Sequence, residues 1–131
     1  MVQRILVCGG RDYKNRDHVY ATLYKLLSPA GHPDDPRHII VHGAARGVDT
    51  FAGDWAEYAG WRQEKFPVTN DDWRRWGNFA GIRRNAIMLQ HCMLKGNLVR
   101  GIAFPGGTGT ADMVRRLREK NILVTEISDA A

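Results

Sequence analysis

The most informative part of this sequence is Gly101–Asp112, which reads GIAFPGGTGTAD. It combines the end of a predicted strand, a turn of small residues and the start of a predicted helix. Its apolar beginning is typical of the end of a buried strand, and Pro105 cannot continue a hydrogen-bonded ladder, so the chain must leave the sheet there. Small residues that let backbone N–H groups and hydroxyls approach a ligand follow, namely Gly106, Gly107, Thr108, Gly109 and Thr110. A helix predicted over Ala111–Lys120 comes next, and helix N-termini attract anions. The stretch therefore predicts a phosphate or carboxylate site, with a tight, well-capped turn as the alternative interpretation.

The composition is that of a soluble globular protein. The 131 residues are 44% hydrophobic and 25% charged, and no run approaches the ~18 apolar residues that span a membrane. We expect one domain over residues 1–131, because a chain of this length builds one core. The apolar run near the N-terminus is too short for a signal peptide, so we expect a cytoplasmic protein without membrane contact.

The cysteines and histidines give no sign of a metal site or a disulfide framework. Cys8 is predicted at a strand end and Cys92 near a helix end, a usage that suits a reducing compartment. The five histidines lack the spacing of metal ligands. We therefore expect neither a metal nor a cofactor.

The charge balance favours an anionic partner. The chain has a formal net charge of +5 and a pI near 9.6. Much of the positive charge lies at the end of one predicted helix, where cations also complement the helix dipole, namely in Arg115, Arg116, Arg118 and Lys120. We therefore expect nucleic-acid binding to be weak.

Apolar strands alternate with amphipathic helices along the chain. The predicted strands are Arg4–Cys8, His38–Val41, Trp61–Phe66, Val99–Phe104 and Ile122–Ile127. Helices are predicted after a cap at Asp12 or Asn15, and over Val48–Tyr58, Asn78–Leu94 and Ala111–Lys120. Two segments are predicted as loops, Ser28–Arg37 and Pro67–Gly77.

This alternation predicts a three-layer α/β sandwich around a mainly parallel, five-stranded sheet. We expect the strand order 3-2-1-4-5, with the polar third strand at an edge. The topology then reverses between the first and fourth strands, and three small-residue turns open at the same carboxyl edge. The turns after the first two strands supply candidates for phosphate contacts, namely Gly9, Gly10, Arg11, Gly43, Arg46 and Gly47.

Several enzyme classes are disfavoured by what these turns lack. A dinucleotide-dependent dehydrogenase needs G-x-G-x-x-G after the first strand, where this chain has GGRD. A P-loop needs a lysine that neither GAARGVDT nor GGTGTADM supplies. No serine lies in a G-x-S-x-G elbow.

Three segments, in order along the chain, resemble members of one superfamily. Residues 42–56, HGAARGVDTFAGDWA, resemble the G-x-A-x-G-[IV]-D-x-x-A segment of the DNA-processing protein DprA (Smf). Asp72-Trp73 and residues 80–88, AGIRRNAIM, resemble the YspA-like branch, and residues 104–110, FPGGTGT, resemble the PGGxGT motif of the LOG phosphoribohydrolases, formerly called lysine decarboxylases. The superfamily is called SLOG, and the resemblance covers nearly the whole chain. It implies a Rossmann-like domain that binds nucleotides or nucleotide-derived ligands, often as a homo-oligomer.

The LOG resemblance implies candidate catalytic residues. LOG enzymes pair an arginine in R-K-x-x-M with the glutamate of PGGxGTxxE at the ribosyl-phosphate bond. In this chain Arg84 matches the arginine, Asn85 stands in place of the lysine, and Met113 stands in place of the glutamate. Asp112 is the nearby carboxylate, but on a helix it points about 100° away from position 113. We therefore expect hydrolysis to be absent or slow, and a glutamate at position 113 to raise it.

Polar and aromatic residues beside these motifs are further candidates for ligand contacts. Asp49 is a candidate for the ribose or base of a ligand, with the first turn of its own helix as the alternative. Asp72, Trp73 and Asn85 are candidates from the YspA-like segment, and Trp73 is also interpreted as an anchor of its loop. Pro105 is included with the glycines and threonines that follow it.

The sequence leaves three functions open. The first is a module, for example a sensor, that binds a nucleotide-derived small molecule through its phosphate. The second is a LOG-like phosphoribohydrolase, an N-glycosidase acting on nucleoside monophosphates. The third is a DprA-like module that binds single-stranded DNA.

Overall fold

Five parallel strands form the sheet at the centre of the molecule. The structure is a computed structural model in which residues 2–27 and 35–129 are described. Its strands are β1 (Gln3–Cys8), β2 (Asp35–His42), β3 (Trp61–Lys65), β4 (Leu98–Ala103) and β5 (Leu123–Glu126). They lie in the order β3-β2-β1-β4-β5, and neighbouring strands pair in parallel. The predicted α/β class and strand order are confirmed.

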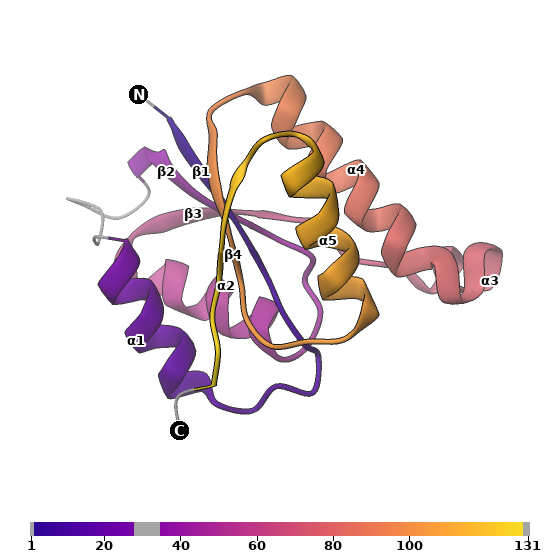
Figure 1. The fold of residues 1–131 in the computed structure, drawn as a ribbon, viewed down its shortest axis with the longest axis horizontal. Helices are drawn as coiled ribbons and strands as arrows, with labels where there is room; N and C mark the ends of the chain where they lie inside the picture. The colour runs from indigo at the N-terminus through magenta and orange to yellow at the C-terminus, as the bar shows by residue number, and fades with distance from the viewer. Residues whose placement is uncertain (1, 28–34, 130–131) are drawn as a thin grey trace.

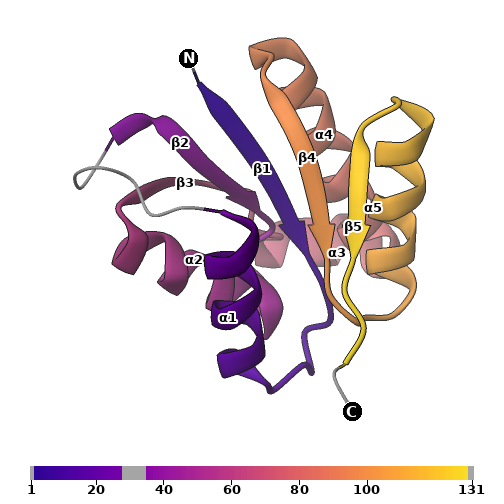
Figure 2. The same cartoon turned by 60° about the vertical axis from the view of Figure 1, so that its left-hand side comes forward.

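Helices cover both faces of this sheet (Figures 1 and 2). They are α1 (Arg16–Leu26), α2 (Val48–Ala59), α3 (Asn70–Trp76), α4 (Ala80–Lys95) and α5 (Thr108–Glu119), with a short 3-10 turn, η1 (Gly77–Phe79), before α4. Helices α1 and α2 pack on one face, and α4 and α5 pack on the other. Helix α3 projects from the body beyond the beginning of α4 (Figure 1).

Alternate residues of β1 build the two halves of the core. Ile5 and Val7 join the buried cluster under α1 and α2, whereas Leu6 and Cys8 join the cluster under α4 and α5. Because β1 is the central strand, it is covered on both faces, which explains its continuous apolar run. Its carboxyl end lies between the ends of β2 and β4, where the topology reverses.

The edge position predicted for the polar third strand is confirmed, since β3 pairs with β2 at one end of the sheet. The predicted loop Ser28–Arg37 lies mostly outside the described residues. Strand β2 begins at Asp35, three residues before the predicted start at His38, because Asp35 pairs with Trp61 across an irregularity in the register.

The prediction of a loop over Pro67–Gly77 is wrong, because residues Asn70–Trp76 form α3. Thr69 caps this helix: its hydroxyl accepts a hydrogen bond from the N–H of Asp72 at 3.1 Å, and the Asp72 carboxylate accepts one from the N–H of Thr69 at 3.0 Å. This reciprocal bonding satisfies N–H groups that a helix start leaves unpaired. Because α3 buries no residue, its sequence carries a capping signal but no apolar periodicity.

Helix α5 begins at Thr108, three residues earlier than predicted, and Gly107 is its N-cap. The threonine and glycine residues that were expected in a loop therefore form the first helical turn.

In the described part of the chain, no helix is long and apolar enough to cross a membrane.

Candidate functional site

The turns after β1, β2 and β4 touch one another at the carboxyl edge of the sheet. The N–H of Gly10 donates to the carbonyl of Pro105 at 2.9 Å, and the carbonyl of Gly10 accepts from the N–H of Val48 at 3.3 Å. A Cβ on Gly10 would lie 3.0 Å from the carbonyl oxygen of Pro105, and a Cβ on Gly47 would overlap the carbonyl oxygen of Gly10. Glycines occupy these positions because the backbones approach too closely for side chains.

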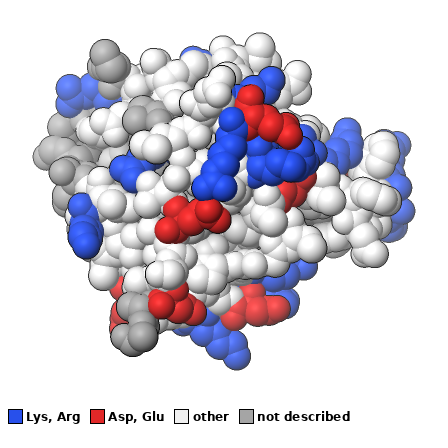
Figure 3. Space-filling view, viewed as in Figure 1, with Lys and Arg blue, Asp and Glu red and all other residues white. Residues whose placement is uncertain are grey.

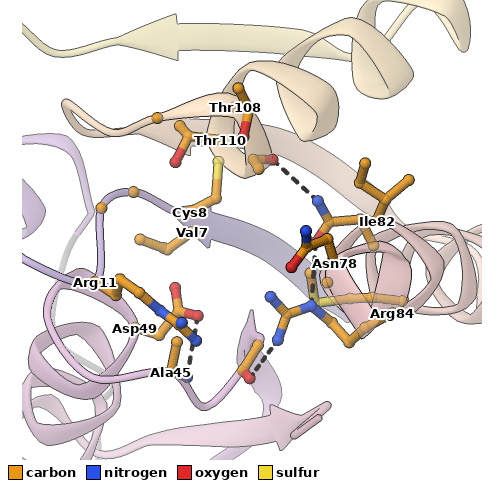
Figure 4. A pocket seen from close by; sticks show the side chains of 18 of the residues that line it. Val7, Cys8, Arg11, Ala45, Asp49, Asn78, Ile82, Arg84, Thr108 and Thr110 are labelled. Carbon is orange, nitrogen blue, oxygen red and sulfur yellow. Dashed lines mark hydrogen bonds between the residues drawn. The ribbon is translucent and has the colours of Figure 1, made fainter. Parts of the chain in front are cut away.

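These turns and the beginning of α4 line a crevice of about 310 Å³ (Figure 4). The end of β1, the turns after β1 and β2, and the first turn of α2 contribute Val7, Cys8, Gly9, Gly10, Arg11, Gly43, Ala45 and Asp49. The helical segments contribute Trp73, Asn78, Gly81, Ile82, Arg84, Asn85, Met88, Gly107, Thr108, Gly109 and Thr110. The crevice lies where β1 and β4 diverge into their turns, the position that ligands favour in open α/β sheets.

The first turn of α5 forms one wall of the crevice. Its cap, Gly107, makes no side-chain hydrogen bond to the first N–H groups of the helix. A Cβ on Gly107 or Gly109 would meet no atom within 4 Å, so there is open space beside this backbone. A Cβ on Gly106, by contrast, would overlap the hydroxyl of Thr110. Uncapped N–H groups at the positive end of a helix dipole make this wall suited to an anion.

Arg84 reaches the crevice from α4 and is held by three oxygen acceptors. Its Nη1 donates to the carbonyls of Gly43 at 2.6 Å and Phe66 at 3.2 Å, and its Nε donates to Oδ1 of Asn85 at 3.1 Å. Burial lowers the pKa of the Arg84 guanidinium, and the charge of Asp49 acts in the opposite direction. The hydrogen bonds fix the orientation of this cation before any ligand arrives.

Asn85 joins α4 to the first turns of α5. Its Nδ2 donates to the carbonyl of Gly109 at 3.0 Å and to Oδ2 of Asp112 at 3.3 Å, while its Oδ1 accepts from Arg84. The side chain is buried, so these bonds are made away from water and are costly to lose. Asn85 therefore couples the position of the arginine to the first turn of α5.

Asp49 is the buried carboxylate of the crevice, with 6% of its surface exposed. It lies in the first turn of α2, and its Oδ2 accepts a hydrogen bond from the N–H of Ala45 at 3.3 Å. Burial raises the pKa of Asp49, although backbone hydrogen bonds and the charge of Arg84 oppose this effect.

Arg11 and Trp73 meet at the mouth of the crevice. The guanidinium of Arg11 lies 5.6 Å from the centre of the Trp73 ring, within the range of a cation–π contact. Trp73 remains 38% exposed. This contact joins the projecting helix α3 to the turn after β1, and both groups are accessible to a ligand.

Most of the predicted ligand contacts line the crevice, namely Gly9, Gly10, Arg11, Gly43, Asp49, Trp73, Arg84, Asn85, Gly107, Thr108, Gly109 and Thr110. The structure places the others outside its lining, namely Arg46, Gly47, Asp72, Pro105, Gly106 and Asp112. Arg46 pairs with Asp12 at 2.9 Å, with both side chains largely exposed. Asp72 caps α3, and the remaining glycines and Pro105 support the packing of the turns.

The two residues at the candidate catalytic positions of α5 are engaged elsewhere. Asp112 forms ion pairs with Arg115 and Arg116, each at 2.8 Å. Burial of Asp112 opposes its ionisation, but the hydrogen bonds from Arg116, Asn85 and Arg115 prevail and lower its pKa. Met113 is fully buried in the core under α4 and α5. A glutamate at position 113 would therefore lie in the core.

Sequence reasoning missed several residues that line the crevice, namely Val7, Cys8, Ala45, Asn78, Gly81, Ile82 and Met88. Ile82 is an apolar residue of a predicted amphipathic helix, a pattern that favours burial rather than ligand contact. Asn78 and Gly81 carry no signal beyond their place near a helix start.

Burial raises the pKa of the Cys8 thiol to about 12, so it is not a ready nucleophile. Among the described residues, no group of three or more His, Cys, Asp or Glu side chains is placed to hold a metal ion.

Comparisons with known proteins agree with this architecture. Residues 3–76 match the YAcAr family, described as the YspA, cpYpsA-related SLOG family. The chain is 33% identical over 134 residues to the "Gene 61 protein" of Mycobacterium phage D29, covering 98% of each protein. Its fold is similar to the X-ray structure of DNA processing protein A (DprA) from Streptococcus pneumoniae, with a TM-score of 0.51 and 17% identity over 95% of this chain. The match spans 58% of that DprA chain. The chain therefore belongs to the YspA, cpYpsA-related SLOG family.

Proposed function

We propose that the crevice binds a nucleotide or nucleotide-derived ligand, with its phosphate against the first turn of α5. The observation that carries this proposal is the glycine-capped N-terminus of α5, which opens into the crevice without a side-chain cap. Each hydrogen bond to a phosphate oxygen is charge-assisted and contributes on the order of 1.5–3 kcal/mol. The cations Arg11 and Arg84 lie in the same crevice and add favourable charge.

The size of the crevice favours a small ligand. Its volume of about 310 Å³ is at the lower end of the range for small-molecule sites. We therefore infer that it accommodates a mononucleotide or one mononucleotide unit of a longer ligand. Trp73 at the mouth offers an aromatic face on which a base can stack.

We further propose that the module binds its ligand without cleaving the glycosidic bond. An N-glycosidase needs a carboxylate that stabilises positive charge or activates water. The thioether of Met113 is buried in the core, and Asp112 is held by two arginines outside the crevice lining. The placement of Met113 and Asp112 therefore favours ligand binding over phosphoribohydrolase activity. A protein that binds a ligand without cleaving it fits a role as a sensor.

A thermal-shift screen tests the proposed function. The full chain would be heated with the four 5′-ribonucleoside monophosphates, their nucleosides, ADP-ribose, dinucleotides and short oligonucleotides. We expect at least one phosphate-bearing ligand to raise the melting temperature, and its phosphate-free nucleoside to have a much smaller effect. Equal effects of nucleoside and nucleotide, or no effect of any ligand, would contradict the proposal. Free base measured by chromatography in the same samples would reveal hydrolysis.

Binding of single-stranded DNA is a second candidate, favoured by the surface around α3. Cationic and aromatic side chains gather there: the guanidinium of Arg83 lies 4.7 Å from the centre of the Trp76 ring, and Trp76 is 42% exposed. Blue side chains edge this projecting end in Figure 3, whereas acidic and basic groups are mixed over α5. Bases stack on such aromatic groups while cations contact the backbone.

Salt dependence separates this candidate from the crevice ligand. Binding of a polynucleotide releases counterions, so its affinity falls steeply with salt. We expect oligonucleotide binding to be weak and to be lost at physiological salt, and mononucleotide binding to persist. Tight oligonucleotide binding at physiological salt, measured by fluorescence anisotropy, would reverse this order of preference.

A further inference from the structure

Asp49 is an unexpected group in a crevice that is suited to an anion. It is buried, it lines the crevice, and it lies in the first turn of α2. A phosphate cannot lie against it, because two negative charges repel strongly where water is excluded. The part of the ligand that contacts Asp49 must therefore donate hydrogen bonds.

The topology places Asp49 on the opposite side of the crevice from the phosphate wall. Strand β1 lies between β2 and β4, so the turn that leads from β2 to Asp49 faces the first turn of α5 across the end of β1. Figure 4 shows Thr108 and Thr110 on one side, Asp49 on the other, and Val7 and Cys8 between them. A nucleotide with its phosphate at α5 therefore extends across β1 towards Asp49. The group next to the phosphate in a nucleotide is its sugar.

The surroundings of Asp49 leave it able to accept hydrogen bonds from such a sugar. An ionised carboxylate has about four acceptor sites, and the backbone N–H groups of Ala45 and Gly43 occupy part of this capacity in Asp49. Gly43 lets both neighbouring groups lie against the backbone: a Cβ there would lie 2.9 Å from Oδ2 of Asp49 and would overlap the guanidinium of Arg84. Asp49 is accessible to a ligand because it lines the crevice itself.

We infer that Asp49 accepts hydrogen bonds from the cis-diol of a ribose, so that the crevice selects ribonucleotides over 2′-deoxyribonucleotides. This inference rests on the proposed function, since it assumes a phosphate at α5. The two hydroxyls of a ribose diol present adjacent O–H donors that match the two oxygens of a carboxylate. A deoxyribose lacks one donor and leaves a buried acceptor without a partner, which is the situation in which a binding site discriminates most strongly.

The test compares each 5′-ribonucleoside monophosphate with its 2′-deoxy counterpart by calorimetric titration of the full chain. A hydrogen bond to a charged group contributes enough for a preference of about tenfold or more for the ribonucleotide. In Asp49→Ala and in the isosteric Asp49→Asn, the ratio of the two affinities should fall close to one, mainly through weaker ribonucleotide binding. Asp54→Asn is the matched control, because Asp54 is an exposed carboxylate of the same helix, and it should retain the wild-type ratio.

Equal affinity of the wild type for the ribo and deoxy forms would overturn this inference, and this measurement needs no variant to fold. A preference that survives in Asp49→Ala would show that another group recognises the sugar. Equal weakening of both forms would show that Asp49 contacts the base or only shapes the turn. The proposed function fails in a different way, namely if neither form binds.

Discussion

Replacing Met113 with glutamate tests how α5 is oriented between the crevice and the core. The glutamate is the residue that phosphoribohydrolase chemistry would require at this position. In the structure the Met113 side chain is 0% exposed and belongs to the cluster under α4 and α5. Met113→Glu therefore places a carboxyl group in the core instead of restoring an active site. We expect a destabilised protein that releases no more free base than the wild type.

The magnitude follows from burial. Loss of the buried apolar surface costs about 1.5–3 kcal/mol, and a buried carboxyl group without a partner costs a further ~1–3 kcal/mol even when protonated. Burial also raises the pKa of a carboxyl group above the unfolded value of about 4.3. The unfolded state then releases the proton more readily, so stability falls by about 1.4 kcal/mol per pH unit above that value until the folded-state pKa is reached. The total at pH 8 is comparable to the whole stability of a typical domain, about 5–15 kcal/mol.

Urea unfolding at pH 5 and pH 8, followed by circular dichroism, measures this effect. We expect Met113→Glu to lose several kcal/mol at pH 5 and up to about 4 kcal/mol more at pH 8. Met113→Leu, which conserves volume, should cost less than about 1.5 kcal/mol at both pH values. A Met113→Glu protein within about 1 kcal/mol of the wild type at both pH values would show that the side chain faces solvent or the crevice, and would refute the core assignment.

Three further predictions concern other buried polar groups. Asn85→Leu removes the bridge to the first turn of α5, so it should weaken binding of a phosphate-bearing ligand in calorimetry and lower stability by about 1–3 kcal/mol; unchanged binding would contradict the coupling. Glu64→Gln leaves the buried Arg4 without its 2.9 Å ion pair, at a cost of about 2 kcal/mol near neutral pH. Burial opposes ionisation of Glu64, but the hydrogen bond and charge of Arg4 lower the pKa of Glu64 overall. The ion pair therefore stabilises the folded state above the unfolded-state pKa of Glu64, and this stabilisation is lost as the pH falls through the folded-state pKa. Equal acid sensitivity of the wild type and Glu64→Gln in urea unfolding would argue against this role of the ion pair. Burial raises the pKa values of Cys8 and Cys92 to about 12, so both should resist alkylation at pH 8, and rapid labelling seen by mass spectrometry would count against their burial.

The sheet could be predicted because its physics is local and repetitive. Continuous apolar runs such as Ile5–Val7 are typical of strands covered on both faces, and small-residue turns mark where β1, β2 and β4 end. The polar residues of β3 predicted an edge strand, since an edge leaves one side of the backbone in contact with solvent. Right-handed crossovers then leave few possible orders, and the observed order is one of them.

Local capping was harder to predict. The loop expected over Pro67–Gly77 contains α3, whose only sequence signal is Thr69 followed three residues later by Asp72. That same capping role explains why Asp72 lies outside the crevice lining. The early start of α5 has a related cause: Gly107 serves as an N-cap, so the helix begins within the glycine-rich turn.

For the candidate site, the position of the crevice could be predicted from the sequence, but the orientation of individual polar side chains could not. Turns that follow neighbouring parallel strands must converge, so the crevice itself could be predicted. Which polar side chain points into it depends on the ion pairs that each side chain forms, both within one helix and between turns. Arg46 pairs with Asp12, and Asp112 pairs with Arg115, so neither lines the crevice.

A substitution at Gly107 tests the phosphate site most directly. Gly107→Val adds a side chain at the N-cap of α5, where a Cβ meets no atom within 4 Å. The fold should therefore tolerate it, while the added bulk obstructs the backbone N–H groups of the first turn. Gly107→Ala provides a smaller obstruction in the same direction.

The measurement is the shift in melting temperature on adding the 5′-ribonucleoside monophosphate that stabilises the wild type most. At a ligand concentration of about 100 Kd, binding adds roughly 2.7 kcal/mol, or on the order of 10 °C for a chain of this size. We expect this shift to be reduced in Gly107→Ala and lost in Gly107→Val, with both variants folded. A Gly107→Val protein that keeps the full wild-type shift would contradict the proposed phosphate site.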